Sequence, residues 1–439
     1  MRRVNFADCL PDNNMFIIYH ICMSNQYDII MIGGGISGLY SAYKILQMAP
    51  ETKLLVLERY KKRWLGGRTG NEMFQGTMVV NGAGIGRKEK DYLLINLLRE
   101  LDIPYSEFQV THNYASTISP PCNVKKVITI LKQHFRDATS KGPVRKTFRE
   151  FALPILGADV YKHFTMCAGY TDYENEDVCD TLYNYGLEDN YGNWTGLHIP
   201  WKRLVETISK KIGLKNIRTS SNVDYIENPS LCNFVVRTDK NVSYSCNKVI
   251  LATTIPSVLK LVPGANDKNS IYQQIHGQAF LRLYGKFSKA SAQIMREYVH
   301  GLTIVPGPLQ KIIPMDPDNG VYMIAYSDNE AAKVLKPRLE NTPENREYFC
   351  NLLELSLGIP NGTLHLNAIM DFYWSVGTHF YDPLPNNFKN RKEFIKKAQA
   401  PLPSMLVVGE MISMNQGWVQ GALESVEAVV TKKWVDKHC

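Results

Sequence analysis

The first part of the chain alternates apolar runs with one amphipathic segment. Residues 29–32 (IIMI) form a continuous apolar run that predicts a buried strand. Glycines follow at positions 33, 34, 35 and 38, and the segment after them spaces its apolar residues as one face of a helix does. A second apolar run, Leu54 to Leu57, leads directly to Glu58. This order of strand, turn, helix and strand predicts the opening unit of a doubly wound sheet.

The remaining chain switches between helical and sheet-like patterns. Helix-like segments rich in leucine, tyrosine and charge dominate from about Arg87 to Pro200, and residues 91–101 are an example. A second irregular region extends from about Asn266 to Gln399. Strands are predicted at residues 222–226, 234–237, 248–253, 280–287, 321–326, 368–374 and 404–410, and helices at residues 201–213 and 421–435.

The glycines between the first strand and helix form the pattern Gly33-x-Gly35-x-x-Gly38. In this context Gly33 allows a tight turn, Gly35 lets the backbone approach a pyrophosphate, and Gly38 lets helix and strand pack closely. Glu58 follows the second strand about 20 residues further on, where a carboxylate accepts hydrogen bonds from ribose hydroxyls and disfavours a 2′-phosphate. The pattern therefore predicts dinucleotide binding.

These patterns predict an α/β protein whose FAD/NAD(P)-binding, Rossmann-like domain is assembled from three segments and interleaved with an α+β substrate domain. We expect an N-terminal extension over residues 1–23, the nucleotide-binding domain in residues 24–86, 196–265 and 399–437, and the substrate domain in residues 87–195 and 266–398.

Composition agrees with a folded protein and limits its partners. Of the 439 residues, 44% are hydrophobic and 21% are charged. The formal net charge is +8, but the basic residues are scattered and residues 61–63 form the only dense basic run, so we expect no nucleic-acid partner. The nine cysteines lie far apart, without a C-x-x-C pair or a histidine cluster at metal-ligand spacing. We therefore expect neither a disulfide scaffold nor a bound metal.

The first 23 residues contain one short apolar stretch, from Met15 to Met23. A secretory signal needs a longer and cleaner apolar run and a small-residue cleavage site. We interpret this segment as a disordered extension, or as sequence upstream of a start at Met23, and expect a cytoplasmic protein. No segment approaches the roughly 20 apolar residues of a transmembrane helix, so we expect no membrane span.

Motifs at the two ends of the chain point to one family. Near the start, Gly66-Gly67-Arg68 follows the second strand and precedes the small-residue run 81–86. Near the end, Val408-Gly409-Glu410 is followed by the turn 416–423, which contains Gly417, Trp418 and Ala422. These residues resemble the flavin-containing amine oxidoreductases, the family of monoamine and polyamine oxidases, although the spacing from Glu58 to the Gly-Gly-Arg is about two residues longer than usual. The resemblance covers nearly all of residues 27–432.

The resemblance implies FAD as the cofactor. It places Arg68 near the FAD phosphates, Glu410 at the ribityl chain and Trp418 against the isoalloxazine ring. No cysteine falls between Met370 and Leu384, where some family members attach the flavin covalently, so we expect non-covalent FAD. The candidate cofactor-binding residues are Gly33, Gly35, Ile36, Ser37, Gly38, Glu58, Arg59, Gly67, Arg68, Gly82, Ala83, Gly84, Val223, Gly409, Glu410, Gly417, Trp418, Val419 and Ala422.

The resemblance also implies candidate catalytic residues. Family members hold the amine between two aromatic side chains, whose π faces suit a cationic or lone-pair nitrogen. Trp418 matches one wall, and Phe380 and Tyr381 are both candidates for the other. Arg282 stands where many members place a lysine over flavin N5, and arginine does not replace lysine there. Either the oxygen reactivity is altered, the substrate carries a carboxylate, or the site does not perform amine chemistry.

The leading hypothesis is an FAD-dependent amine oxidase that converts a small-molecule amine and O2 to an imine, then an aldehyde, and hydrogen peroxide. One alternative is a flavin-dependent desaturase or protoporphyrinogen-oxidase-like enzyme, because those enzymes share both end motifs. Another is a non-catalytic FAD-binding protein that scaffolds a partner.

Overall fold

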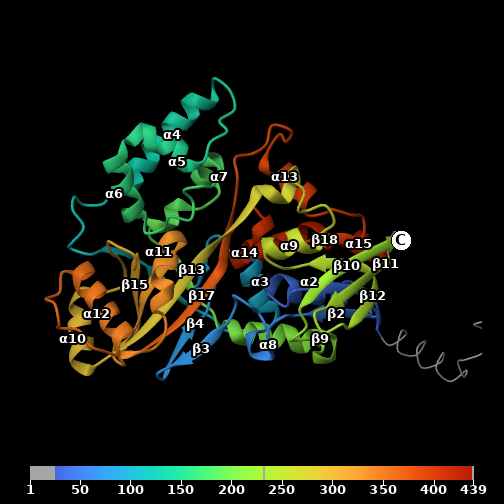
Figure 1. Ribbon diagram of the computed structural model, residues 1–439, viewed down its shortest axis with the longest axis horizontal. Coiled ribbons are helices and arrows are strands. Elements are labelled where there is room, and N and C mark those ends of the chain that lie inside the picture. Colours follow the sequence, from blue (N-terminus) through green and yellow to red (C-terminus); the bar gives the residue numbers. More distant parts are fainter. Residues whose placement is uncertain (1–24, 231–232, 438–439) are drawn as a thin grey trace, which may run out of the picture.

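The computed structural model describes residues 25–230 and 233–437, so the predicted extension 1–23 lies outside the described residues. Two main sheets stand next to each other, and a lobe of helices stands above them (Figure 1). The α/β class predicted from the sequence is confirmed. Within the described residues, none of the helices combines the length and the apolar character that crossing a bilayer requires.

The first sheet has seven strands and is parallel at its centre. β1 lies between β2 and β12 and runs parallel to both, and β9 extends the sheet beyond β2. On its other side, β12 pairs with β11 along its first half and with β18 along its second half. The strands are β1 (Gln26–Ile32), β2 (Leu54–Leu57), β9 (Ile217–Arg218), β10 (Val223–Ser230), β11 (Asn233–Thr238), β12 (Ser243–Leu251) and β18 (Met405–Val407).

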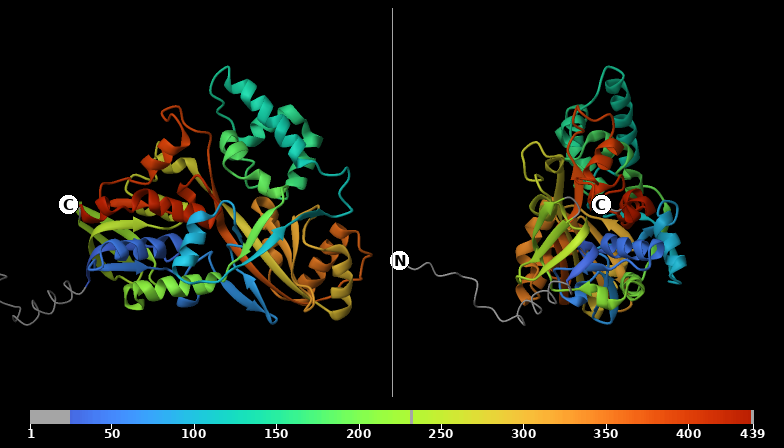
Figure 2. Two further views of the ribbon diagram at one scale, coloured as in Figure 1. Left: turned by 180° about the vertical axis from the view of Figure 1, so that it is seen from behind. Right: turned by 90° about the vertical axis from the view of Figure 1, so that its right-hand side faces the viewer.

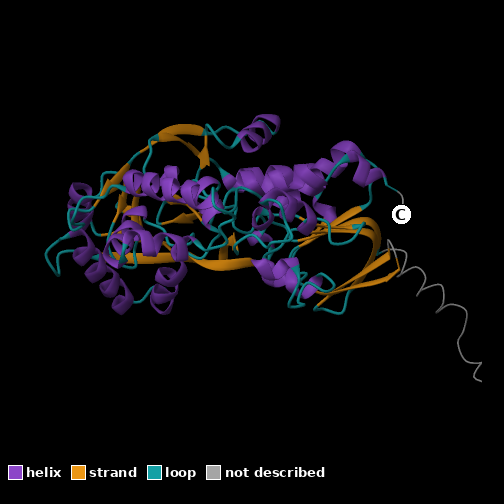
Figure 3. Cartoon of the chain, turned by 90° about the horizontal axis from the view of Figure 1, so that it is seen from above, coloured by secondary structure: helices purple, strands orange, loops and turns teal. Residues whose placement is uncertain are grey.

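Helices lie on both sides of the strands when the chain is seen from above (Figure 3). Around the first sheet, α2, α3, α8 and α14 share one apolar core on one face, and α9 and α13 close the core on the other face. These helices are α2 (Ile36–Met48), α3 (Tyr92–Glu100), α8 (Trp201–Ile212), α9 (Ile255–Leu261), α13 (Arg391–Ala398) and α14 (Val419–Val429).

Helix α3 packs on the first sheet. Leu94, Leu97 and Leu98 of α3 are buried in the core of that sheet, although the sequence analysis placed residues 87–195 in the substrate domain. An amphipathic pattern shows that one face of a helix is buried, but not against which sheet. The domain boundaries stay predictions.

The second sheet has six strands in the order β17-β13-β16-β15-β14-β7. Its two longest strands, β13 and β17, pair antiparallel from Ile275 opposite Tyr381 to Phe287 opposite Leu366, and they reach from the second sheet to the first. Helices α10, α11 and α12 pack against this sheet. The elements are β7 (His112–Tyr114), β13 (Ile275–Phe287), α10 (Lys289–Tyr298), β14 (Leu302–Ile304), β15 (Lys311–Asp316), β16 (Val321–Asp328), α11 (Asn329–Leu335), α12 (Pro343–Leu357) and β17 (Leu366–Tyr381).

Two small sheets lie between the main ones. One is the hairpin of β3 (Asn71–Phe74) and β4 (Thr77–Val80), and the other orders β5 (Gly86–Arg87), β8 (Trp194–His198) and β6 (Ser106–Val110). The Tyr284 hydroxyl of β13 donates to the carbonyl of Val80 at 2.6 Å and so ties the hairpin to the second sheet.

The helical lobe consists of four helices with an aromatic core of its own, and it projects from the rest of the chain (Figure 2). Its helices are α4 (Val124–Thr139), α5 (Phe148–Leu156), α6 (Ala158–Ala168) and α7 (Val178–Tyr183). A disulfide joins Cys122, just before α4, to Cys167 near the end of α6. The sequence analysis expected no disulfide scaffold and did not identify this single bond, because the contact between two cysteines 45 residues apart depends on how the helices pack.

The closing helix also differs from its prediction. Residues 421–435 do not form one helix, because α14 ends at Val429 and α15 (Lys432–Asp436) begins after Thr431. The Thr431 side chain accepts a hydrogen bond from the backbone N–H of Trp434, which is the geometry of a helix start.

Candidate active site

The glycine turn connects the end of β1 to the start of α2. Gly33 has a φ of +107°, and a Cβ there would lie 2.2 Å from the carbonyl oxygen of Ala252. A Cβ on Gly38 would lie 2.0 Å from the carbonyl oxygen of Gly33, so helix and strand approach as closely as glycine allows. Neither position accepts a side chain, as the sequence analysis expected.

The start of α2 is open on the side that would face a ligand. A Cβ on Gly35 would meet only the carbonyl oxygen of Gly66, at 4.0 Å. Gly67, which follows Gly66 in the chain, has a φ of +58° and open space where a Cβ would be. Among the described residues, no side chain caps the helix that begins with Ile36 and Ser37, so its first N–H groups and its positive dipole end suit a phosphate. The cradle therefore fits a pyrophosphate.

Glu58 lies directly after β2 and is 5% exposed. Its carboxylate accepts hydrogen bonds from the backbone N–H groups of Gly34, at 2.7 Å, and Tyr60, at 2.8 Å. Burial raises the pKa of the Glu58 carboxyl above its ordinary value, while these two donors act against the shift. Arg59 is exposed and stacks on Tyr60, and Val223 begins β10 with its side chain in the core.

Arg68 and Glu410, from the two end motifs, form an ion pair. The Nη1 atom of Arg68 lies 2.8 Å from Oε1 of Glu410 and 2.6 Å from the carbonyl oxygen of Gly377 on β17. The same Oε1 lies 2.6 Å from Nδ1 of His379, and Oε2 accepts from the backbone N–H of Gly417 at 3.0 Å. Burial alone would raise the pKa of Glu410, but the His379 imidazole and the Arg68 guanidinium outweigh it and hold this pKa well below its usual range. Glu410 thus fixes three segments of the chain to one another.

The small-residue run lies against this ion pair. A Cβ on Gly82 would come within 2.3 Å of the carbonyl oxygen of Arg68, and the same oxygen accepts from the N–H of Ala83 at 2.6 Å. A Cβ on Gly84 would lie 3.1 Å from the Nη2 atom of Arg282. The run therefore forms the floor between the glycine turn and the second sheet.

The closing turn is equally tight. Gly409 has a φ of +132°, and its N–H donates to Oγ of Ser425 at 2.8 Å. Gly417 has a φ of +77°, and a Cβ on Gly421 would lie 2.0 Å from the carbonyl oxygen of Asn415. Val419 then starts α14, and Ala422 is buried in its first turn. The turn holds the start of α14 beside Glu410.

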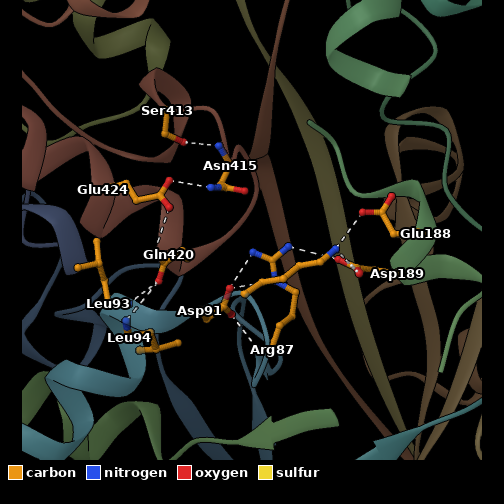
Figure 4. Close-up of polar contacts among 11 residues, drawn as sticks. Arg87, Asp91, Leu93, Leu94, Glu188, Asp189, Ser413, Asn415, Gln420 and Glu424 are labelled. Carbon is orange, nitrogen blue, oxygen red and sulfur yellow. Dashed lines mark hydrogen bonds and ion pairs between the residues drawn. The ribbon is translucent and has the colours of Figure 1, made fainter. Parts of the chain in front are cut away.

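Trp418 occupies the position just before α14 and has a charged neighbour on one face of its ring. The Cζ atom of Arg87 lies 3.7 Å from the centre of the Trp418 ring. Asp91 accepts from Nη2 of Arg87 at 2.7 Å, and Asp189 accepts from Nη1 at 3.3 Å (Figure 4). Gln420 accepts from two N–H groups at the start of α3, which keeps α14 docked on α3. The sequence analysis missed Arg87, Asp91 and Asp189; only Arg87 and Asp91 have a helix-like spacing that could have indicated a pair.

Arg282 lies on β13 between the two sheets and is 5% exposed. Its Nε donates to the carbonyl oxygen of Gly82 at 2.6 Å, and its Nη2 donates to the hydroxyl of Tyr326 at 3.0 Å. Its Cζ also lies 4.1 Å from the centre of the Tyr326 ring. The guanidinium is held on several sides and directly borders the floor of the site.

Phe380 and Tyr381 differ in their surroundings. Tyr381 is 2% exposed, packs against Phe394 and donates its hydroxyl to the carbonyl of Ser413 at 3.1 Å. Phe380 is only partly buried and lies 5.1 Å from the His276 ring, centre to centre. Of the two, Phe380 is the one not committed to the core.

An acidic cavity lies beside the closing turn. Three carboxyl groups, from Asp172, Glu176 and Asp180, line it. Asp172 accepts from the hydroxyl of Tyr185, and Asp180 pairs with Nε of Arg391 at 2.6 Å, which ties α7 to α13. The sequence analysis missed these residues, although five acidic residues within positions 172–180 were a visible signal. The other lining residues include Asn184, Gln278, Thr378, His379, Phe380, Tyr381, Met414, Gln416 and Gly417.

A buried charge cluster links this cavity to Arg282. Lys311 is 2% exposed, and its ammonium lies over the ring of Tyr170. Burial lowers the pKa of Lys311 well below its usual range, and the carboxylates of Asp328 and Asp172 oppose this shift. Burial and the neighbouring Asp328 raise the pKa of Asp172 to about 7. Lys311 is the first residue of β15 and directly precedes two isoleucines, but its partners come from distant segments.

No protein-family model matches the chain. A relative, an uncharacterized protein of Acanthamoeba polyphaga mimivirus, is 20% identical over 484 aligned residues that cover 93% of this chain and 94% of the relative. Among solved structures, a double mutant of putrescine oxidase matches with a TM-score of 0.71 at 14% identity, over 92% of this chain and 98% of that one. Cyclohexylamine oxidase from Brevibacterium oxydans IH-35A matches with the same TM-score and coverage at 15% identity.

Sequence identities of 14% and 15% carry a fold and not a substrate. The structural match nevertheless covers 92% of this chain and 98% of each of these two neighbours. The chain has the fold of the flavin-containing amine oxidoreductases, the family that its two end motifs resemble.

Proposed function

We propose that the chain is an FAD-dependent amine oxidase that converts an amine and O2 to an imine, then an aldehyde, and hydrogen peroxide. One observation carries this proposal: Gln416 and Gly417 of the closing turn, which resembles the flavin-contacting turn of the family, also line the acidic cavity. A cofactor site and a site for a basic ligand therefore share a wall. Bound FAD would supply the two-electron oxidation, and the protein would supply orientation and electrostatics.

The residues that would hold FAD are those of the cradle. The open start of α2 with Gly35 and Gly67 would take the pyrophosphate, and Glu58 would accept from the ribose. Arg68 would balance phosphate charge, and Trp418 would bound the ring. Because no cysteine lies between residues 370 and 384, we expect acid precipitation of the holoprotein to release the flavin into the supernatant. Flavin that stays in the pellet would contradict non-covalent binding.

The cavity favours a basic amine as the substrate. Asp180 is already paired with Arg391, and burial raises the pKa of Glu176 well above its usual range, so Asp172 is the lining carboxyl left to meet a cation. Phe380 offers an aromatic face for the amine nitrogen. Oxidation requires the uncharged amine, so a proton acceptor must lie near the alkylammonium that enters. Asp172 is suited to that role, because its pKa of about 7 lets it exchange a proton at neutral pH.

A second candidate function is a flavoprotein that does not oxidise amines. The observation that favours it is Arg282, whose contacts with Gly82 and Tyr326 hold a permanent charge beside the floor of the site. The third candidate, a desaturase-like enzyme for apolar substrates, fits this cavity less well, since the carboxyls of Asp172, Glu176 and Asp180 make its lining polar.

Anaerobic mixing separates these candidates. The purified FAD-loaded protein is mixed with mono-, di- and polyamines, and the flavin absorbance is followed. We expect at least one basic amine to bleach the flavin, and admission of O2 to restore the colour with formation of hydrogen peroxide. If no amine bleaches the flavin while an apolar polyene or a porphyrinogen does, the amine oxidase proposal is wrong. If nothing reduces it, the non-catalytic alternative holds.

A further inference from the structure

Three metal-ligating side chains meet in the helical lobe, away from the candidate active site. Cys122 lies just before α4, and His163 and Cys167 lie on α6. Their ligand atoms all lie within 4.8 Å of one another. Cys122 and Cys167 form the disulfide, and Nε2 of His163 lies 3.4 Å from Sγ of Cys167. A histidine therefore stands against a cysteine pair that can exist in two oxidation states.

The geometry of this group suits a tetrahedral metal ion once the disulfide is reduced. Zinc bonds of about 2.3 Å to sulfur and about 2.0 Å to nitrogen place S and N about 3.5 Å apart, and two sulfurs about 3.8 Å apart. His163 and Cys167, four residues apart on one helix face, already have this separation. The Cα atoms of Cys122 and Cys167 are 5.6 Å apart, so side-chain rotation alone can separate the two thiols.

An ion can reach this group from solvent. A cavity of about 530 Å³ borders α6 and is lined by His163 together with Asp159, Lys162 and Met166. Cys122 and His163 are only partly buried, whereas Cys167 is buried. An entry path and a partly enclosed ligand set are both features that a metal site requires.

We propose that the reduced lobe binds one Zn²⁺ through Cys122, His163 and Cys167, with water as the fourth ligand, and that disulfide formation releases the ion. A small-molecule dithiol reduces the disulfide: two electrons and two protons convert it to two thiols, while the dithiol becomes oxidised. Zn²⁺ then displaces the two thiol protons. A peroxide reverses the reaction, since it takes two electrons and is itself reduced to water while the S–S bond forms.

The proposed metal site is connected to the candidate active site by a short segment of the chain. α6 ends at Ala168, and the next residues lead through Tyr170 to Asp172. The Tyr170 ring packs edge-on against Tyr326 with ring centres 5.6 Å apart, and Asp172 lines the acidic cavity. Zn²⁺ or the disulfide would each anchor the start of this segment. The metal proposal itself does not depend on the proposed oxidase activity.

Cobalt titration tests the proposal on the FAD-loaded chain. The protein is reduced with a dithiol, freed of it under anaerobic conditions, and titrated with Co²⁺, whose tetrahedral thiolate complexes absorb in the red, beyond the flavin bands. We expect one Co²⁺ per chain, displaced by one equivalent of Zn²⁺. The same titration after oxidation with hydrogen peroxide should give no red band.

Three variants locate the ligands. His163→Ala and Cys167→Ser should each weaken Co²⁺ binding at least tenfold, while Cys179→Ser, a free cysteine at the start of α7, should bind Co²⁺ as the parent does. Thermal unfolding of each apo variant monitors the fold separately. The proposal is wrong if the reduced chain gives no red band, if Cys167→Ser retains it, or if the disulfide yields to the dithiol only when the protein unfolds.

Discussion

The Cζ atom of Arg87 lies 3.7 Å from the centre of the Trp418 ring, so one face of this indole is already occupied by a cation. Only the other face is available to a flavin or a substrate. Arg87 itself is 3% exposed and is held by Asp91 and Asp189, which come from the start of α3 and from the segment before β8. The orientation of Trp418 therefore depends on residues far from it in sequence.

Arg87→Lys should lower kcat on the best amine about tenfold or more, with FAD content unchanged. Lysine keeps the charge but loses the planar fork that bonds both aspartates while covering the ring. Steady-state kinetics with O2 uptake and a flavin spectrum give the two readouts. Lys88→Ala is the matched control, because Lys88 makes only an exposed ion pair with Glu107 and should behave as the parent. A fully active Arg87→Lys protein would show that Trp418 needs no support from Arg87.

Glu58→Ala should weaken FAD binding at least ~10-fold, which corresponds to about 1.4 kcal/mol. The variant loses the acceptor for the ribose and also leaves the N–H of Gly34 without its partner. Fluorescence titration of the apoprotein with FAD measures the dissociation constant. Glu51→Ala, an exposed carboxylate in the loop before β2, should leave it unchanged. Full flavin retention by Glu58→Ala would remove the basis for the nucleotide assignment.

Local patterns explain why the strand-turn-helix-strand unit at the start of the chain was predictable. The positions of Gly33, Gly38 and Glu58 follow from a strand, a turn and a helix that are adjacent in sequence, and each position has one backbone requirement. The closing turn around Gly409 and Gly417 is local in the same way. Both motifs are tight turns in the structure, at the places where the sequence analysis expected them.

Contacts between distant segments explain what the sequence could not predict. Arg87 meets Asp189 across 102 positions, and Cys122 meets Cys167 across 45. Lys311 on β15 and Asp172, in the segment between α6 and α7, interact across 139 positions of the chain. Periodicity shows which face of an element is buried, but it does not show which partner a buried charge meets.

Glu410→Gln should lower the free energy of unfolding by about 3 kcal/mol at pH 7. The substitution removes a buried negative charge on which Arg68 and His379 converge, and leaving their donors without it is costly. Urea denaturation of both proteins, followed by tryptophan fluorescence, measures the difference. Glu330→Gln, which removes the exposed ion pair of Glu330 with Lys333 on α11, serves as the control for a surface pair.

The difference in free energy of unfolding between the parent and Glu410→Gln should depend on pH with a definite sign. Because the pKa of Glu410 is lower in the folded chain than in the unfolded chain, its stabilisation is complete above the ordinary glutamate pKa of about 4.3 and is lost as the pH falls below it. The parent and Glu410→Gln should therefore differ by a constant amount from pH 7 to 5 and converge below about pH 4. A difference that grows on acidification would contradict the ion-pair assignment.

Asp172→Asn should lower kcat/KM for a basic amine at least ~10-fold, because the variant can neither attract the ammonium nor accept its proton. In the parent, kcat/KM should rise with pH through about 7 as Asp172 loses its proton, and Asp172→Asn should lack this rise. Ionisation of the amine itself would give the same rise in both proteins, so the comparison separates the two. Asp159→Asn, an exposed carboxylate of the lobe, is the control.

Stability measurements test whether the role of Asp172 is purely structural. If it were, Asp172→Asn would lose stability and activity together. The folded pKa of Asp172 is raised, so its favourable contribution is present below the ordinary aspartate pKa of about 3.9 and is lost as the pH rises to about 7. The parent should thus lose stability relative to Asp172→Asn over this window. A variant that is stable at pH 8 but inactive on amines assigns Asp172 to the reaction. A variant that is active, with an unchanged pH profile, removes it from the reaction and leaves the acceptor of the amine proton elsewhere in the cavity.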